Sequence, residues 1–308
     1  MSLNSKGREL ISGILNIDKP QGWTSHDVVA RVRRLTGQRR VGHAGTLDPL
    51  ATGVLLICLG QATRVAEYLM GGQKRYRATL RLGISTDTYD ADGQVTRDVG
   101  PVDVSLEDVE AALSTFVGEI EQVPPLYSAL KRDGQPLYRL ARRGQAMEPQ
   151  PRRVTIETVE IVHWASPELT LEIVCSPGTY VRSLAHDLGK RLGCGAHVTA
   201  LRRLASGRFT AAEAISLDVL AEAAACGQWT SLLHPLEAAL LDFEAVEVDA
   251  VEAQRLLHGQ SIPCPKPPTT ALGRAYDPAG HLIAIVAHDA RGSVWRPGKV
   301  FGRTTNDE

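Results

Sequence analysis

The sequence predicts an α+β fold built on a mixed or antiparallel sheet. Residues 76–84 alternate between apolar and polar side chains, which is typical of a strand with one buried face. Predicted strands and helices succeed one another irregularly, without the βαβ rhythm of a parallel sheet. After about residue 243 the pattern changes to short strands around one helix. We therefore expect a large domain over residues 1–243 and a small β-rich domain over residues 244–308.

The amino-terminal elements follow from turn and cap signals. A strand is predicted over residues 11–18, and the turn KPQG ends it. Thr24 and Asp27 then open a helix over residues 24–35 with a capping-box pattern, and a glycine follows its last turn. A glycine-rich loop over residues 42–53 leads into the apolar run VLLICL, which predicts a buried strand.

Apolar periodicity and helix stops mark the later elements. Ser105 caps a predicted helix over residues 105–117, and Gly118 follows it. A second helix, over residues 180–192, buries one apolar face and stops at Gly193. The other expected elements are strands over residues 154–162 and 169–175, a helix over residues 249–258, and short strands near residues 272, 282 and 295.

The composition is that of a globular protein with reduced thiols. Of the 308 residues, 43% are hydrophobic and 22% are charged. The 34 basic and 35 acidic residues nearly cancel, so a polyanionic partner must be held by local clusters of charge. The five cysteines include no CxxC pair, which argues against a disulfide scaffold or a cysteine zinc site. We find no targeting segment and no apolar run long enough for a membrane, and therefore expect a cytoplasmic protein.

Several common functional motifs are missing from the sequence. It contains no GxGxxG, no GxxxxGK[ST] and no HExxH, so nucleotide-driven chemistry and zinc proteolysis lose their usual support. Cys194 and His197 have the spacing of a metal-ligand pair but lack the further ligands that zinc needs. We therefore expect no metal site and no cofactor.

The loop GHAGTLDPLATGVL, residues 42–55, is the most unusual segment of the chain. Three glycines and a proline surround one carboxylate, Asp48, and such a loop can present an acid at a fixed angle. Taken alone, however, Asp48-Pro49 is also a common turn dipeptide, and His43 could simply be a hydrogen-bonding loop residue. The loop by itself leaves both interpretations open.

Together with four other segments, this loop resembles the bacterial tRNA pseudouridine-55 synthases of the TruB type. The other segments are LNIDKPQGWTS, KRYRATLRLG, DTYDADG and CSPGTYVRSLAHDLGKRLGCGAHVTALRR, and the resemblance covers residues 11–210. It implies a pseudouridine-synthase catalytic domain with a central mixed, mainly antiparallel sheet flanked by helices. The segment RLLHGQSI and the strands around it resemble a PUA-like domain at the C-terminus.

The resemblance also implies roles for individual residues. Asp48 matches the catalytic aspartate, Tyr76 the tyrosine that stacks on the target base, and Arg182 the arginine that pairs with the catalytic carboxylate. Without the resemblance, Tyr76 could be a core residue and Arg182 a surface or phosphate-binding arginine. The implied substrate-binding residues are His43, Tyr180, Leu201 and Lys19, of which Lys19 belongs to the KP motif that supports the active-site loop.

The chemistry of the implied reaction agrees with these residue types. Uridine becomes pseudouridine when the C1′–N1 bond breaks and a C1′–C5 bond forms, without redox change, so no cofactor is required. A carboxylate in a pocket that excludes water needs a cationic partner to stay charged, and we expect Arg182 to pair with Asp48 through two parallel contacts. Whether Asp48 attacks C6 of the uracil or C1′ of the ribose, or only stabilises a glycal-like intermediate, is open at this point.

Basic clusters predict where RNA would be held. Residues 131–153 contain seven basic and two acidic residues, and the family has an inserted, mobile RNA-clasping element at the position of residues 124–152. Arginines over residues 31–40 form a second cluster, and each cluster could also be no more than a solvated face. The predicted RNA-binding residues are Lys131, Arg132, Arg142 and Arg143 in the inserted segment, and Arg202 and Arg203, which with Arg208 form a third cluster.

We expect the partner to be the T-arm of tRNA, with no membrane, no required protein partner and a monomeric chain. Three other functions are open at this stage. The protein could be a tRNA-binding folding chaperone, or a guide-RNA-dependent pseudouridine synthase. A nucleoside hydrolase or transglycosylase would need a second acid near Asp48, which Asp87, Asp90 or Asp92 could supply.

Overall fold

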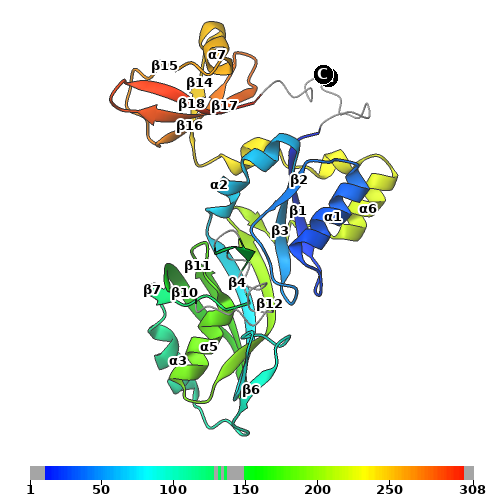
Figure 1. Ribbon diagram of the computed structural model, residues 1–308, viewed down its shortest axis with the longest axis vertical. Coiled ribbons are helices and arrows are strands. Elements are labelled where there is room, and N and C mark those ends of the chain that lie inside the picture. Colours follow the sequence, from blue (N-terminus) through cyan, green and yellow to red (C-terminus); the bar gives the residue numbers. More distant parts are fainter. Residues whose placement is uncertain (1–10, 128–130, 133–134, 137–148, 302–308) are drawn as a thin grey trace.

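The computed structural model describes residues 11–127, 131–132, 135–136 and 149–301. Nine of the described strands form one large sheet, and five form a smaller sheet that lies above it in Figure 1. The large sheet contains β1 (Gly13–Lys19), β2 (Val41–Ala44), β3 (Thr52–Leu59), β4 (Lys74–Leu82), β7 (Gly118–Gln122), β10 (Arg152–Ala165), β11 (Glu168–Cys175), β12 (Ala196–Ser206) and β13 (Phe209–Thr210).

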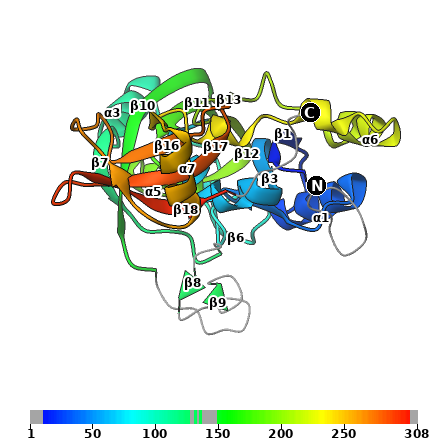
Figure 2. The same ribbon diagram turned by 90° about the horizontal axis from the view of Figure 1, so that it is seen from above.

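The smaller sheet is formed by β14 (Glu244–Glu247), β15 (Ile262–Pro263), β16 (Leu272–Tyr276), β17 (Leu282–Asp289) and β18 (Val294–Val300). Two further ribbons pair β5 (Ile84–Thr86) with β6 (Val95–Asp98), and β8 (Lys131–Arg132) with β9 (Gln135–Pro136). Figure 2 shows that the β8–β9 ribbon projects from the body of the molecule.

The strand order of the large sheet confirms the predicted α+β class. Its strands follow the order β1-β3-β12-β4-β11-β10-β7, with β2 paired to β3 and β13 paired to β12. Among the described strands of this sheet, β3 and β12 run parallel and the other pairs are antiparallel. The sheet is therefore mixed and mainly antiparallel.

Helices cover apolar side chains on both faces of this sheet. The first helix begins where the capping box predicts, because Thr24 Oγ1 accepts a hydrogen bond from the Asp27 amide at 3.1 Å. The described helices are α1 (Ser25–Thr36), α2 (Ala66–Met70), α3 (Leu106–Ser114), α5 (Val181–Arg191), α6 (Leu217–Ala225) and α7 (Ala250–Leu257), with 3₁₀ turns η1 (Gly60–Arg64), η2 (Trp229–Leu232) and η3 (Leu236–Ala239).

The structure corrects three of the expected elements. The helix predicted over residues 105–117 ends at Ser114, and Gly118 begins strand β7. The predicted glycine-rich loop contains the short strand β2, which pairs with β3. In the smaller sheet, β14 and β15 are additional to the strands that the sequence predicts. Each of these strands has at most five residues, too few for a periodic pattern to stand out.

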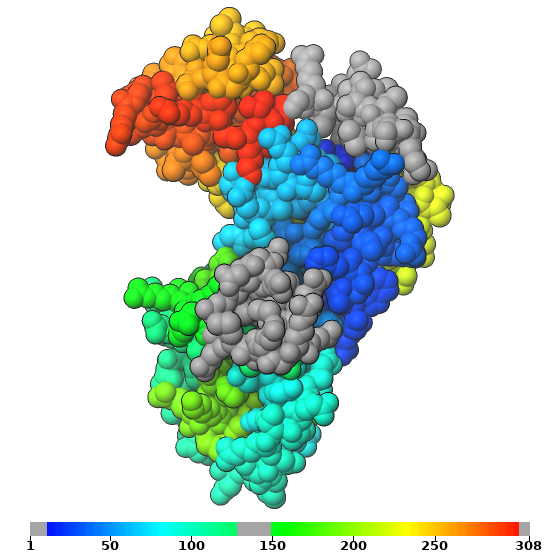
Figure 3. Space-filling view, viewed as in Figure 1, coloured from blue at the N-terminus to red at the C-terminus, as the bar shows by residue number. Residues whose placement is uncertain are grey.

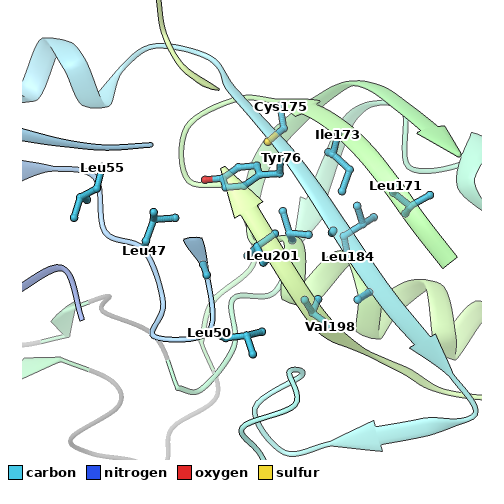
Figure 4. Close-up of a cluster of buried hydrophobic side chains, with 14 of the residues drawn as sticks. Leu47, Leu50, Leu55, Tyr76, Leu171, Ile173, Cys175, Leu184, Val198 and Leu201 are labelled. Carbon is cyan, nitrogen blue, oxygen red and sulfur yellow. The ribbon is translucent and has the colours of Figure 1, made fainter. Parts of the chain in front are cut away.

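One continuous apolar core joins the two halves of the large sheet. On one side of it α1 and α6 pack against β1 and β3, and on the other α3 and α5 pack against β4, β10 and β11. Figure 4 shows part of this core, with Tyr76 at the edge of a row formed by Ile173 and Leu171 and its hydroxyl pointing toward the side of Leu47. The core therefore extends directly to the loop that carries Asp48.

The smaller sheet is attached to the large one through α2 and η1. Arg64 donates a hydrogen bond to the carbonyl of Val300 at 2.5 Å, and Lys299 is ion-paired with Glu67. A second apolar cluster, which includes Phe301, continues from β1 and β3 into this junction. In Figure 3 the outline of the molecule is concave between the smaller sheet and the lower half of the large sheet.

The parallel contact between β3 and β12 depends on a glycine. Gly53 has φ of +94°, and a Cβ atom at this position would lie 2.2 Å from the carbonyl oxygen of Arg203.

We predict that Gly53→Ala destabilises the fold by at least about 2 kcal/mol, because the energy of the strained backbone angle and that of the clash with the main chain add to each other. Thermal unfolding measures this. Gly22→Ala is the matched control, since Gly22 has φ of +80° but no atom within 4 Å of the added carbon, and should cost about 1 kcal/mol. Equal losses in the two variants would contradict the prediction.

Candidate active site

A pocket of about 350 Å³ opens between the loop after β2, the strand β4 and the loop that precedes α5. Six of the residues singled out from the sequence line it, although they are distributed over more than 150 positions of the chain. These residues are Asp48, Tyr76, Tyr180, Arg182, Leu201 and Arg203.

The loop that carries Asp48 is held by the turn between β1 and α1 and by the first residue of α1. Ser25 Oγ accepts a hydrogen bond from the Leu47 amide at 2.9 Å, and the Gly22 amide donates to the carbonyl of Pro49 at 2.8 Å. The backbone on both sides of Asp48 is therefore fixed by contacts with a different segment. This explains why the KPQGWTS and GHAGTLDP segments act together.

Lys19 completes this support but lies outside the pocket. It is fully buried, and its Nζ donates to three main-chain carbonyls, those of Pro20, Trp23 and Pro49, at 2.9, 2.6 and 3.3 Å. Burial lowers the pKa of Lys19 to about 8, against the opposing effect of the Asp48 carboxylate. The expectation that Lys19 contacts substrate is therefore corrected: the side chain supports the loop from behind.

Arg182 connects the carboxylate of Asp48 to a second carboxylate. Its Nε lies 2.9 Å from Asp48 Oδ2, and its Nη1 lies 3.1 Å from Asp90 Oδ2. Nη1 also donates to the carbonyl of Thr88 at 3.0 Å, and Nη2 to the carbonyl of Tyr127 at 3.1 Å. The predicted pairing with Asp48 is correct, but the expected two parallel contacts are wrong, because the other guanidinium nitrogens are used elsewhere.

Asp90 is a charged residue beside the site that the sequence interpretation did not assign to this chemistry. Its side chain is 6% exposed and lies in a tight turn, where Thr88 Oγ1 donates to Asp90 Oδ1 at 2.5 Å and the Asp92 amide donates to the same oxygen at 3.2 Å. The DTYDADG segment offered three acids, and nothing in their spacing identified the one that faces Arg182.

The electrostatics of the site are dominated by burial of Asp48. Burial raises the pKa of Asp48, the Arg182 guanidinium lowers it, and the Asp90 carboxylate raises it. Asp48 remains accessible, with 33% of its side chain exposed into the pocket, whereas Arg182 is 5% exposed. The arrangement is that of a reactive carboxylate on the pocket floor with a fixed cationic partner behind it.

This arrangement predicts how the reaction depends on pH. If the ionised form of Asp48 is the reactive one, kcat/KM falls as the pH decreases through a pKa above the ordinary value of 3.8. In Asp90→Asn the acid limb should move to lower pH, because a like charge is removed and Arg182 is left to Asp48 alone. A pH profile of kcat/KM for both proteins measures this. An acid limb that stays in place or moves to higher pH would contradict it.

Tyr76 and Arg203 form the opposite wall of the pocket. Tyr76 is 9% exposed and Arg203 is 1% exposed. Burial raises the pKa of Tyr76, and the neighbouring Arg203 guanidinium opposes this shift. Arg203 donates to the carbonyl of Val54 at 2.6 Å and to that of Gly45 at 3.3 Å. Its assignment to an exposed RNA-binding cluster is therefore wrong, since the side chain is buried and holds the walls of the pocket together.

Tyr180 precedes the first residue of α5, at the mouth of the pocket. Gln122, which is 1% exposed, fixes its backbone in both directions: Gln122 Oε1 accepts from the Tyr180 amide at 2.7 Å, and Gln122 Nε2 donates to the Tyr180 carbonyl at 3.0 Å. Leu201, on β12, adds an apolar surface. The pocket thus offers aromatic and apolar walls around one carboxylate.

His43 lies on β2 and is not among the residues that line this pocket. Its ring contacts that of His26 edge to face, with centroids 5.4 Å apart. Burial lowers the pKa of His43, so the ring is neutral at physiological pH. A contact between His43 and substrate remains a prediction.

The remaining RNA-binding residues are placed as follows. Arg202 is 39% exposed and ion-paired with Asp18 at 2.8 Å, and Arg208 is 43% exposed and ion-paired with Asp242 at 2.9 Å. Lys131 and Arg132 form strand β8, whose side chains are not described, and Arg142 and Arg143 lie outside the described residues. Two arginines of the third cluster are thus engaged in ion pairs within the protein. The RNA-binding role of the inserted segment remains a prediction.

Among the described residues, no group of His, Cys, Asp and Glu side chains has an arrangement that could hold a metal ion. A search of the same residues for a helix of sufficient length and apolarity to cross a membrane finds none.

Comparison with known proteins identifies the family. Residues 33–181 match the family described as TruB family pseudouridylate synthase (N terminal domain). Residues 182–245 match the tRNA pseudouridylate synthase B C-terminal domain, and residues 243–302 match the tRNA pseudouridine synthase II C-terminal domain. A tRNA pseudouridine synthase B of Ralstonia nicotianae is 44% identical over 95% of this chain and 95% of its own length. The chain belongs to the TruB family of pseudouridylate synthases.

Other relatives agree with this membership. A tRNA pseudouridine synthase B of Burkholderia mallei is 46% identical over 90% of this chain and 93% of its own length. Among solved structures, a Cbf5-Nop10-Gar1 complex contains a chain with a TM-score of 0.73 and 25% identity, covering 98% of this chain and 90% of that one. An archaeal box H/ACA sRNP Nop10-Cbf5 complex gives a TM-score of 0.72 at 24% identity, over 96% of this chain and 88% of that one. The predicted pseudouridine-synthase fold, with a β-rich C-terminal part, is confirmed.

Proposed function

We propose that this TruB family member converts uridine 55 in the T-loop of tRNA into pseudouridine. The observation that carries the proposal is the ion pair between Asp48 and Arg182, which both line the same pocket as Tyr76 and Leu201. Curated relatives that are 44–46% identical to the chain carry the name tRNA pseudouridine synthase B. A folded RNA loop would have to extrude its base into such a pocket, which costs less in a loop than in a duplex.

The residues of the pocket have roles that fit an isomerisation at the glycosidic bond. Asp48 supplies the negative charge, or the nucleophile, next to the ribose while the C1′–N1 bond breaks. Arg182 keeps this carboxylate ionised and correctly oriented. Tyr76 and Leu201 enclose the uracil, which must turn over before C5 bonds to C1′. The C5 proton then leaves to a base, and N1, which has lost its bond to C1′, takes up a proton from solvent. Substrate and product have the same atoms and the same oxidation state, so the reaction balances without a cofactor.

The finer features of the function are also proposals. The inserted segment, residues 124–152, would grip the RNA backbone through its basic side chains. We propose that residues 1–243 act as the catalytic unit and residues 244–308 as an accessory PUA-like domain, a division supported by the start of the smaller sheet at Glu244. We further propose that the chain works in the cytoplasm as a monomer without a protein partner, as its resemblance to the stand-alone TruB-type synthases implies.

Two of the other functions considered from the sequence, the glycosidase and the chaperone, fit the site less well. A glycosidase needs a second free acid, but Asp90 is bound by Arg182 and by its own turn and does not line the pocket. A chaperone without catalysis would have no use for a buried carboxylate whose ionised form must be maintained at an energetic cost.

Tritium release tests the proposed function. A tRNA transcript labelled at C5 of its uridines is incubated with the purified chain, because C5 loses its hydrogen when it bonds to C1′. We expect about one equivalent of tritium per tRNA, and none from a transcript in which uridine 55 is replaced by cytidine. Tight binding without release would favour the chaperone, and free uracil among the products would favour the glycosidase.

A further inference from the structure

The turn that carries Asp90 contains a strained residue. Tyr89 has φ of 63°, in the left-handed region that residues other than glycine rarely adopt. The conformation costs about 1–3 kcal/mol and persists only when the surroundings hold it. Both neighbours of Tyr89 contact Arg182, Thr88 through its carbonyl at 3.0 Å and Asp90 through its carboxylate at 3.1 Å. The strain therefore lies between the two groups that orient Arg182.

Two elements hold Tyr89 in this conformation. On one side the Val198 amide of β12 donates to the Tyr89 carbonyl at 3.0 Å, and the Ala91 amide donates to the Val198 carbonyl at 2.9 Å. On the other side the ring of Tyr89 stacks on the ring of His186, with centroids 3.9 Å apart and planes inclined by 17°. The backbone of the turn is thus bound to the sheet, and its side chain is bound to α5.

His186 lies one helical turn after Arg182 on the same face of α5. The helix therefore directs Arg182 toward Asp48 and Asp90. Four residues later it directs the ring of His186 toward Tyr89, the residue beside Asp90. Nδ1 of His186 is buried and has no hydrogen-bond partner within the described part of the chain. Burial also lowers the pKa of His186, so the ring is neutral and stacking is its main described contact.

We propose that His186 is a positioning residue for the isomerisation: by stacking on Tyr89 it keeps the Thr88 carbonyl and the Asp90 carboxylate aimed at Arg182, which in turn orients Asp48. This inference rests on the proposed function. Neither ring lines the pocket, so the stack would act on the reaction only through Arg182. Loss of the stack would remove this ring contact between the left-handed turn and α5.

The first test compares His186→Ala with His186→Phe in single-turnover tritium release. His186→Ala should lower the rate of the bound complex about 10-fold, with KM nearly unchanged, because misplaced catalytic groups reduce the rate rather than binding. His186→Phe retains a flat ring and should stay within about 2-fold of the wild type. Thermal unfolding of both variants shows whether they are folded. A folded His186→Ala with the wild-type rate, or a His186→Phe as slow as His186→Ala, would overturn the proposal.

A second measurement does not depend on activity. The carboxyl pKa of Asp48 can be followed by NMR in protein labelled with ¹³C-aspartate, with Asp48→Asn to assign the signal. The charged groups that act on Asp48 are Arg182, Asp90 and Lys19. In His186→Ala the pKa of Asp48 should rise further, because a less ordered Arg182 stabilises the carboxylate less well. An unchanged pKa would overturn the proposal. Absence of tritium release by the wild type would instead refute the proposed function, and the NMR titration would still decide the role of His186.

Discussion

Replacement of Asp48 by asparagine is expected to abolish tritium release while tRNA binding is retained. The amide has nearly the same shape as the carboxylate but carries no negative charge and is not a nucleophile. Removal of such a group lowers the single-turnover rate by at least about 1,000-fold. The fold should persist, because Arg182 keeps its contacts with Asp90 and with the carbonyls of Thr88 and Tyr127.

The control for this prediction is the affinity for unmodified tRNA, measured by filter binding with wild type and Asp48→Asn at the same salt concentration. Equal affinities with unequal rates assign Asp48 to the chemical step. If Asp48→Asn releases tritium at the wild-type rate, the assignment of Asp48 is wrong. If the variant neither binds nor unfolds cooperatively, thermal unfolding will show that the charge serves the fold instead.

The sequence could predict elements whose two faces differ or whose ends are capped. In β4, the residues Tyr76, Ala78, Leu80 and Leu82 are buried, whereas Arg75, Arg77 and Arg81 are exposed, because helices cover one face of this part of the sheet. In β3 the run VLLICL is buried on both faces, since α1 lies on one side and the α2 region on the other. An alternating pattern thus indicates a strand with one covered face, and a continuous apolar run indicates a strand that is covered on both faces.

The order of the strands could not be predicted from these patterns. The parallel contact of β12 with β3 joins residues 150 positions apart, namely Arg202 with Thr52 and Arg203 with Gly53. Periodicity shows which side of a strand is buried, but not which strand lies beside it. The family resemblance supplied the central sheet, and local physics alone reached only the α+β class.

Of the candidate site, too, only a part could be predicted from local sequence patterns. Asp48 could be found because glycines and prolines isolate one carboxylate in a loop, and the resemblance added Tyr76 and Arg182. Arg203 was assigned to the surface because a neighbouring arginine and a nearby basic residue looked like a charge cluster. In the structure, alternation along β12 directs Arg202 to Asp18 and Arg203 into the protein. Consecutive residues of a strand face opposite sides, so a pair of adjacent arginines is not a cluster.

Replacement of Arg182 by lysine should also slow the reaction strongly, although the charge is kept. The guanidinium reaches Asp48 through Nε and Asp90 through Nη1, and a single ammonium group cannot occupy both positions. One buried carboxylate then lacks its partner, and we expect the rate to fall at least about 100-fold. Arg77→Lys is the matched control, because Arg77 is 52% exposed and pairs with Glu172, and neither residue lines the pocket. It should change the rate less than about 2-fold.

A double variant distinguishes the loss of orientation from the loss of charge balance. If the ammonium of Arg182→Lys is shared between two carboxylates, then Asp90→Asn in the same protein leaves one cation for one carboxylate. The double variant should therefore be faster than Arg182→Lys alone, although Asp90→Asn by itself removes a contact from the wild-type site. Single-turnover tritium release of the four proteins forms a double-mutant cycle. If the rate effects of the two single substitutions simply multiply in the double variant, Asp90 and Arg182 act independently. That result would contradict the 3.1 Å contact between them.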